Sequence, residues 1–181
     1  MKRLLVLATV LIAAVTLSAQ ATHPIKSPSV VESATIGGKT ITISYASPRL
    51  KGRAGSIFTK DGLISHDPTY PVWRAGANAA TTLHTDTAIE IGGLAVLPGT
   101  YTLYIDLSDP ANWVLIVNKQ TGQWGTDYDK VQDLGRIKLT TTQSSPTVEN
   151  LKFTLKDNGN KNGTLTLAWE NVSASTPLTV R

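Results

Sequence analysis

The chain of 181 residues contains no cysteine, so no disulfide framework supports its fold and no thiolate is available for catalysis or lipid attachment. It also lacks a G-x-S-x-G element, and this absence removes the nucleophile elbow of serine hydrolases. Only three histidines are present, and no HxH or HExxH pair places two metal ligands on one element. The fold must therefore be stabilised by its apolar core.

Long apolar runs are equally scarce, and the one present lies at the start of the chain. It extends from Leu4 to Leu17, follows Lys2 and Arg3, and precedes a small-x-small sequence at 19–21. This order is typical of a secretory signal peptide, and the run is shorter than the roughly 20 residues that a membrane-spanning helix requires. We expect residues 1–21 to be removed and residues 22–181 to be exported, to the periplasm or the medium, without a membrane span.

Neither sign of charge dominates the chain. The formal net charge is +4, and without Lys2 and Arg3 the count becomes 15 basic against 13 acidic residues, or +2. The only local basic cluster is PRLKGR at 48–53, and no aromatic residues interleave with it. Nucleic acid is therefore not an expected partner.

Short runs of alternating apolar and polar residues fill the rest of the chain, and Gly, Pro, Asn or Asp bound each run. This pattern is typical of strands with one face on a core. The run at 112–119 is apolar on both faces, as in a strand covered on both sides. We predict an all-β fold, a single antiparallel β-sandwich or partly open barrel of nine to ten strands, over residues 22–181. The predicted strands are 30–36, 39–47, 81–91, 99–107, 112–119, 136–140, 150–157, 163–170 and 178–180.

Paired turn residues connect these runs. Gly37-Gly38 and Gly92-Gly93 each follow an isoleucine and predict tight hairpins, because two glycines supply positive φ at no steric cost. Asn158-Gly159 and Asn162-Gly163 bracket what we expect to be a longer hairpin loop. A single helical turn is expected within 128–134.

Two histidines and two carboxylates suggest one catalytic hypothesis. His84 and Asp86 share a parity opposite to that of Leu83, so they point to the same face of their strand. If the loop that carries His66 and Asp67 folds over that face, the four side chains form a metal site for a metal-assisted hydrolase. The competing interpretation is that all four are ordinary polar surface residues.

The stretch YPVWRAGANAATTLHTD, residues 70–86, carries the main candidate site. Trp113 and Trp169 continue alternating strands and are expected in the core, whereas Trp73 and Trp124 lie among hydrogen-bonding residues. We predict a cationic, aromatic-lined cleft at one end of the sandwich. The expected ligand-binding side chains are Lys51, Arg53, Trp73, Arg74, Asn78, His84, Lys119 and Trp124. In the alternative, the stretch is an architectural corner in which Trp73 is core and Arg74 holds backbone carbonyls.

Several motifs resemble a secreted bacterial family known as domain of unknown function 2911. They cover most of the chain after residue 21: KGR at 51–53, IF at 57–58, VWRAGANAATT at 72–82, IGG and LPGTYTLY within 91–104, WVLIVNKQTGQWG at 113–125, and LAWEN at 167–171. The resemblance implies an exported, β-rich domain. It implies no catalytic residue and no cofactor.

These observations favour a secreted, non-catalytic binding domain. Its expected partner is a small polar ligand, a glycan or an envelope protein, and no cofactor or catalytic residue is assigned. Two alternatives remain open. One is the metal-assisted hydrolase built on His66 and His84, and the other is a purely structural envelope protein.

Overall fold

The computed structural model describes residues 27–181. The predicted signal peptide at 1–21 lies outside the described residues. Within the described part of the chain, no helix is long and apolar enough to cross a membrane.

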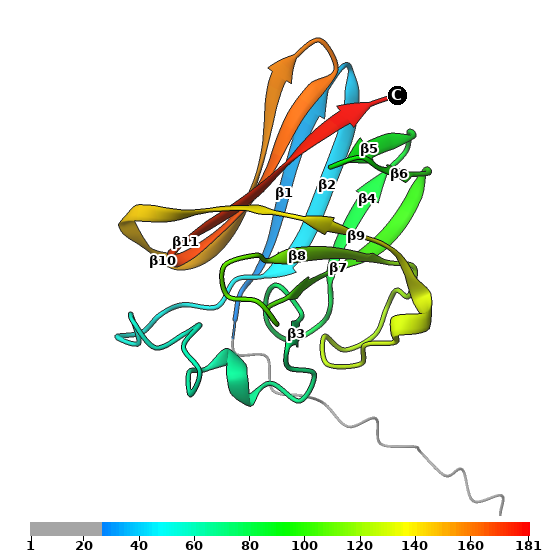
Figure 1. Cartoon of the computed structure of the whole chain (residues 1–181). Helices are drawn as coiled ribbons and strands as arrows, with labels where there is room; N and C mark the ends of the chain where they lie inside the picture. The colour runs from blue at the N-terminus through cyan, green and yellow to red at the C-terminus, as the bar shows by residue number, and fades with distance from the viewer. Residues whose placement is uncertain (1–26) are drawn as a thin grey trace, which may run out of the picture.

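Two antiparallel β-sheets pack face to face (Figure 1). The larger sheet has the order β1-β2-β4-β7-β8-β9, and the two-residue strand β3 also pairs with β7. Its strands are β1 Ser29–Ile36, β2 Lys39–Ala46, β3 Val72–Trp73, β4 Thr81–Thr85, β7 Gly99–Asp106, β8 Val114–Asn118 and β9 Asp133–Lys138. The smaller sheet has the order β10-β11-β5-β6, formed by β10 Thr140–Gly159, β11 Asn162–Val180, β5 Ile89–Ile91 and β6 Leu94–Val96. The predicted antiparallel sandwich is confirmed.

The alternating residues of both sheets meet in one large core. Ile41 and Ile43 of β2 are fully buried, and they belong to the same cluster as Phe153 of β10 and Leu167 of β11. Strand β8 is covered on both faces, as predicted, since Leu115 enters this core while Ile116 joins a second, smaller cluster on the opposite face. Val72, Tyr104 and Tyr128 complete that second cluster.

The glycine pairs form the tight hairpins expected from the sequence. Gly37 and Gly38 have φ of 57° and 78° between β1 and β2, and Gly92 and Gly93 connect β5 to β6 in the same way. The prediction of a longer loop between β10 and β11 is wrong. Gly159 pairs directly with Asn162, and the turn is made by two residues with positive φ, Asn160 and Lys161.

The predicted strand 81–91 is two strands in different sheets. Strand β4 ends at Thr85, whose hydroxyl donates to the carbonyl of Thr87 at 2.8 Å, and β5 begins at Ile89. The chain therefore crosses from one sheet to the other at 86–88. Leu83 and Ile89 are nevertheless both buried, because alternation continues through the crossover. This unbroken alternation is why the sequence suggested one strand.

Two single 3-10 turns interrupt the β-structure. One covers Lys130–Gln132, within the expected range, and the carboxylate of Asp129 accepts the amide of Val131 at its start. The other covers Ile64–His66 and was not expected. The second turn belongs to the long connection between β2 and β3, which lies at the lower end of the sandwich in Figure 1.

The outer edge of β10 is tied to the larger sheet by hydrogen bonds. The amides of Leu151, Phe153 and Leu155 donate to Pro48 O at 2.9 Å, Tyr45 Oη at 3.2 Å and Glu32 Oε1 at 3.0 Å, respectively. These acceptors satisfy amides that an edge strand would otherwise expose. The bond to Pro48, together with that from the amide of Leu50 to Glu149 O at 2.9 Å, also fixes the segment after β2 against β10, and this segment forms part of the candidate site.

Candidate functional site

Residues 74–80 form a corner that projects from the end of the larger sheet. Trp73 pairs with Ile105 of β7, and Thr81 pairs with Leu103 of the same strand. Seven residues therefore lie between two positions whose partners on β7 are only two residues apart. Ala75 and Asn78 have positive φ, of 49° and 62°. The sequence offered a corner in this stretch as one interpretation, whereas the left-handed Ala75 had no sequence signal.

The corner is held by the segment that contains Trp124. Ala79 and Trp124 form an isolated antiparallel bridge, the amide of Ala80 donates to Gln123 O at 3.2 Å, and the amide of Gly125 donates to Asn78 O at 3.0 Å. Gln123 also donates from Nε2 to Tyr104 Oη at 3.1 Å. These contacts place the half-buried ring of Trp124 beside the corner.

Arg74 forms an ion pair with Asp67 across the corner. Its Nη2 lies 2.7 Å and its Nε 3.2 Å from Asp67 Oδ2, and the two side chains are 16% and 7% exposed. Asp67 also accepts the hydroxyl of Thr69 at 3.2 Å. The corner interpretation expected Arg74 to hold backbone carbonyls. Its main partner is instead a carboxylate, and Asn78 O is a more distant acceptor at 3.5 Å.

Trp73 belongs to the core, which corrects the prediction that its ring offers a stacking surface. Its relative exposure is 0%, and its ring stacks on that of Trp169 with centroids 5.9 Å apart. Phe58 packs edge-on against Trp73 at 5.5 Å and lies 4.8 Å from Trp113. The indole Nε1 of Trp73 has no hydrogen-bond partner among the described residues. A buried donor without a protein partner is uncommon. Trp73 also contributes to the lining of a hollow.

This hollow, which we call the end cleft, has a volume of about 420 Å³ and a lining drawn from several segments that are far apart in the sequence. It brings together most of the side chains selected from the sequence. These are Arg53, His66, Asp67, Trp73, Arg74, Asn78 and Trp124. Asn78 Nδ2 donates to Ser27 O at 3.1 Å at its margin. The volume lies within the range of about 300–1,000 Å³ that is usual for small-molecule sites.

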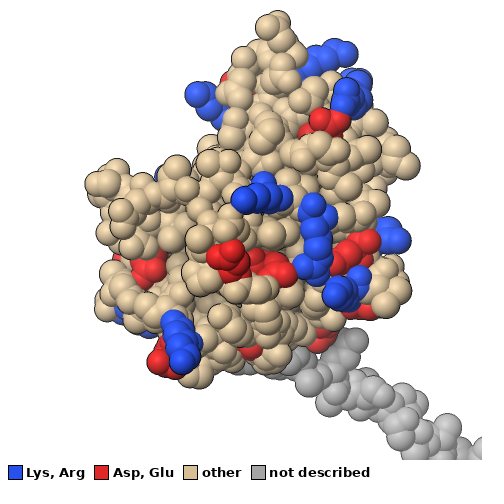
Figure 2. All heavy atoms as spheres, viewed as in Figure 1, with Lys and Arg blue, Asp and Glu red and all other residues tan. Residues whose placement is uncertain are grey.

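A second hollow, the basic hollow, adjoins the end cleft and shares Ser27, Pro48 and Arg53 with it. It has a volume of about 610 Å³, and Arg49 and Lys51 also line it. The sequence selected Lys51 and Arg53 but did not select Arg49, although Arg49 belongs to the same PRLKGR cluster. Figure 2 shows basic and acidic side chains interspersed over the face that it presents.

Glu170 anchors the segment that follows Arg53, and sequence reasoning missed it. Its side chain is buried, its φ is 57°, and its Oε1 accepts the amides of Gly55 and Ile57. A buried carboxylate requires such donors. The only sequence signal was the position of Glu170 at the end of the alternating strand pattern 163–170.

The structure does not bring His84 and Lys119 to the cleft. The ring of His84 is half exposed on β4, three residues beyond Thr81 and so about 10 Å along the strand from the corner. It contacts Thr100 Oγ1 at 2.9 Å and Asp86 Oδ1 at 3.0 Å. Lys119 is exposed after β8 and lines neither hollow.

The metal hypothesis is not supported by these positions. Asp67 is engaged by Arg74, and the Nδ1 of His66 lies 2.7 Å from the carbonyl of Gly62. His84 and Asp86 form their own surface pair. Among residues 27–181, no three His, Cys, Asp or Glu side chains gather in a way that would hold a metal ion.

A charged network lies beside the smaller cluster on β8. Tyr128 Oη donates to Asp133 Oδ2 at 2.9 Å and accepts Arg136 Nη2 at 2.8 Å. Burial, followed by the hydrogen bond to Asp133, raises the pKa of Tyr128 to about 12. Burial alone would raise the pKa of Asp106, but hydrogen bonds from Ser108 and Arg136 outweigh it and lower that pKa. The network fastens the 128–133 segment to the sheet.

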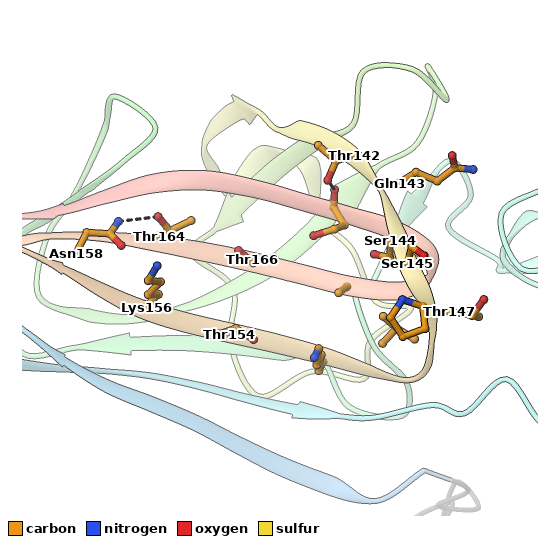
Figure 3. A pocket seen from close by; sticks show the side chains of 15 residues that line it. Thr142, Gln143, Ser144, Ser145, Thr147, Thr154, Lys156, Asn158, Thr164 and Thr166 are labelled. Carbon is orange, nitrogen blue, oxygen red and sulfur yellow. Dashed lines mark hydrogen bonds between the residues drawn. The ribbon is translucent and has the colours of Figure 1, made fainter.

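Two further hollows lie elsewhere on the surface. The larger, of about 800 Å³, lies on the outer face of β10 and β11 (Figure 3). Hydroxyl and amide side chains line it together with Lys152 and Lys156, a composition usual for the solvent face of a sheet. The other, of about 380 Å³, is apolar and includes Phe58, Tyr70 and Trp113.

Comparison with known proteins gives a family and no more specific relative. No curated protein matches the chain, and no solved structure matches it either. A family model described as protein of unknown function (DUF2911) matches residues 27–178, which contain both strands of the corner and every residue of the end cleft and the basic hollow. The chain therefore belongs to the DUF2911 family.

Proposed function

We propose that this protein is an exported, non-catalytic binding domain that holds a small polar ligand in the end cleft. The observation that carries the proposal is the convergence of Arg74, Asn78 and Trp124 on one hollow of about 420 Å³. Trp124 lies 46 residues after Asn78 in the sequence. The hollow is maintained by hydrogen bonds within its walls.

The cleft offers the chemistry that a polar ligand requires. Arg74 is fixed by Asp67, so its planar group presents the remaining N–H donors in a defined direction. The amide of Asn78 and the ring of Trp124 supply hydrogen bonding and an aromatic surface. Orientation by a few fixed polar groups is typical of small-molecule sites.

A purely structural role is the second candidate, and the burial of Trp73 together with the Arg74–Asp67 ion pair favours it. These features stabilise the corner whether or not a ligand binds. The two candidates differ in one respect, since only a binding domain gains stability from a ligand that occupies the cleft.

Isothermal titration against a panel of sugars and cell-wall fragments tests the proposal. The informative variant is Asn78→Gly, because glycine adopts the positive φ of this position while it removes the amide. We expect a bound member of the panel to lose about tenfold in affinity in Asn78→Gly, as for one hydrogen bond to a polar ligand. The matched control is Lys119→Gln, which lies outside both hollows and is expected to bind normally. A ligand whose affinity is unchanged in Asn78→Gly would contradict the proposal, and an absence of any binding would favour the structural role.

A further inference from the structure

Three cationic side chains surround the basic hollow without acidic partners. The five ion pairs of the described residues involve Arg74, His84, Arg136 twice and Arg181, and none involves Arg49, Lys51 or Arg53. No Asp or Glu lines the hollow. One neighbouring carboxylate is that of Glu149, whose Oε1 accepts the backbone amide of Lys51 at 3.1 Å. The hollow therefore concentrates positive charge beyond what one neighbouring carboxylate offsets.

The local backbone holds the charged group of Arg53 in a fixed position. The amide of Arg53 donates to Leu50 O at 3.1 Å, which closes a turn whose central residues, Lys51 and Gly52, have φ of 49° and 77°. The guanidinium of Arg53 folds back over the turn. Its Nε donates to Leu50 O at 2.9 Å and its Nη2 to Arg49 O at 2.9 Å.

These two bonds orient the guanidinium without neutralising it, because both acceptors are uncharged carbonyls. A guanidinium carries five N–H donors, so most of them remain for another acceptor. A planar donor group held in this way matches the oxygens of a carboxylate, sulfate or phosphate. Arg49 and Lys51 supply further positive charge around the same space.

From this geometry we propose that the ligand of the end cleft is anionic, and that its carboxylate, sulfate or phosphate group binds in the basic hollow at Arg49, Lys51 and Arg53. This inference rests on the proposed function. Arg53 lines both hollows, so a ligand bound there extends from the charged group toward Asn78 and Trp124. An acidic sugar and a sugar phosphate both have this chemistry.

Lys152 and Lys156 provide a comparison within the same protein. They also line a hollow without a carboxylate, on the outer face of β10. However, their ammonium groups are carried on flexible chains and make no hydrogen bond among the described residues that would fix them. If loose positive charge were sufficient for anion binding, this hollow would bind anions equally well.

The test has two arms and uses calorimetric titration at constant ionic strength, which removes general screening effects. The first arm compares inorganic phosphate with chloride, and the second compares galacturonate with galactose and glucose 6-phosphate with glucose. The variants are Arg49→Gln, Lys51→Gln and Arg53→Gln, and the matched control is the double variant Lys152→Gln, Lys156→Gln. The side chains of Arg49 and Lys51 make no hydrogen bond among the described residues, so these two substitutions preserve the turn even if Arg53→Gln loosens it.

We expect phosphate to bind, at least one acidic ligand to bind more tightly than its neutral counterpart, and each basic-hollow variant to weaken anion binding about tenfold. The lysine double variant is expected to bind anions normally. The inference would be overturned if the lysine double variant lost as much anion affinity as the basic-hollow variants. It would also be overturned if anion binding survived all three basic-hollow substitutions.

The outcomes also separate this inference from the proposed function. Neutral sugars that bind as tightly as their acidic counterparts, and lose affinity in Asn78→Gly, would overturn the anionic ligand while the end cleft remains a binding site. Phosphate binding that depends on Arg49 and Arg53, with acidic sugars unaffected by Asn78→Gly, would support the anion site and overturn the role of the cleft. Absence of phosphate binding in the unmodified protein would overturn the inference directly.

Discussion

Removal of the Asp67 carboxylate is expected to destabilise the whole domain, because this group compensates a buried charge. In Asp67→Ala, Arg74 keeps its guanidinium at 16% exposure and loses both bonds to Oδ2, at 2.7 and 3.2 Å. Removing one partner of a buried ion pair costs about 3–5 kcal/mol, and the partial exposure of Arg74 favours the lower end, about 3 kcal/mol. For a domain of this size that loss corresponds to a fall of roughly 6–12 °C in Tm.

Urea denaturation measures the effect, with a lower midpoint and an unchanged slope expected for Asp67→Ala. A double variant with Arg74→Met removes both charges, and we expect it to recover about 2 kcal/mol relative to the sum of the single losses. The exposed pair of His84 and Asp86 serves as the control, since Asp86→Ala is expected to change stability by less than about 0.5 kcal/mol. If Asp67→Ala cost no more than Asp86→Ala, the ion pair would not be what holds the corner.

The remaining predictions concern packing, titration and processing. In Gly125→Ala the new Cβ would lie 2.4 Å from Arg74 Cδ, so we expect a loss of about 1–3 kcal/mol in thermal unfolding, and an unchanged Tm would contradict the packing described. The pKa of Tyr128 is raised to about 12 from 10.0 by burial and by Asp133, so its contribution to stability is complete below pH 10 and is lost as the pH rises toward 12. Absorbance titration is expected to lose its highest step in Tyr128→Phe. Mass spectrometry of the exported protein is expected to give Thr22 as the first residue, and an intact residue 1 would contradict the signal peptide.

Most strands were predictable because each is encoded by its own residues. The alternation in β2, β7 and β10 assigns one face of each strand to the core, and the glycine pairs at 37–38 and 92–93 fix tight turns. The crossover at 86–88 was missed for a related reason. Alternation records which face is buried, and it does not change when a strand leaves one sheet and continues in the opposite one.

The candidate site was predictable in its residue types and only partly in its members. Arg53, Arg74, Asn78 and Trp124 were selected for hydrogen bonding or aromatic character, and they do converge. His84 was wrongly grouped with them, since its distance along β4 places it away from the corner. Sequence position gave no measure of that distance.

By itself, the sequence determined the strand pattern, the hairpins and the chemical character of the end segments, because these depend on interactions within a few residues. Only the tertiary structure decided that Trp73 is core, since its burial depends on Phe58 and Trp169, and that Arg74 pairs with Asp67. The same holds for the basic hollow. Its turn is fixed by Glu149, which lies 98 residues beyond Lys51, and contacts over such separations arise from sheet packing that no local pattern encodes.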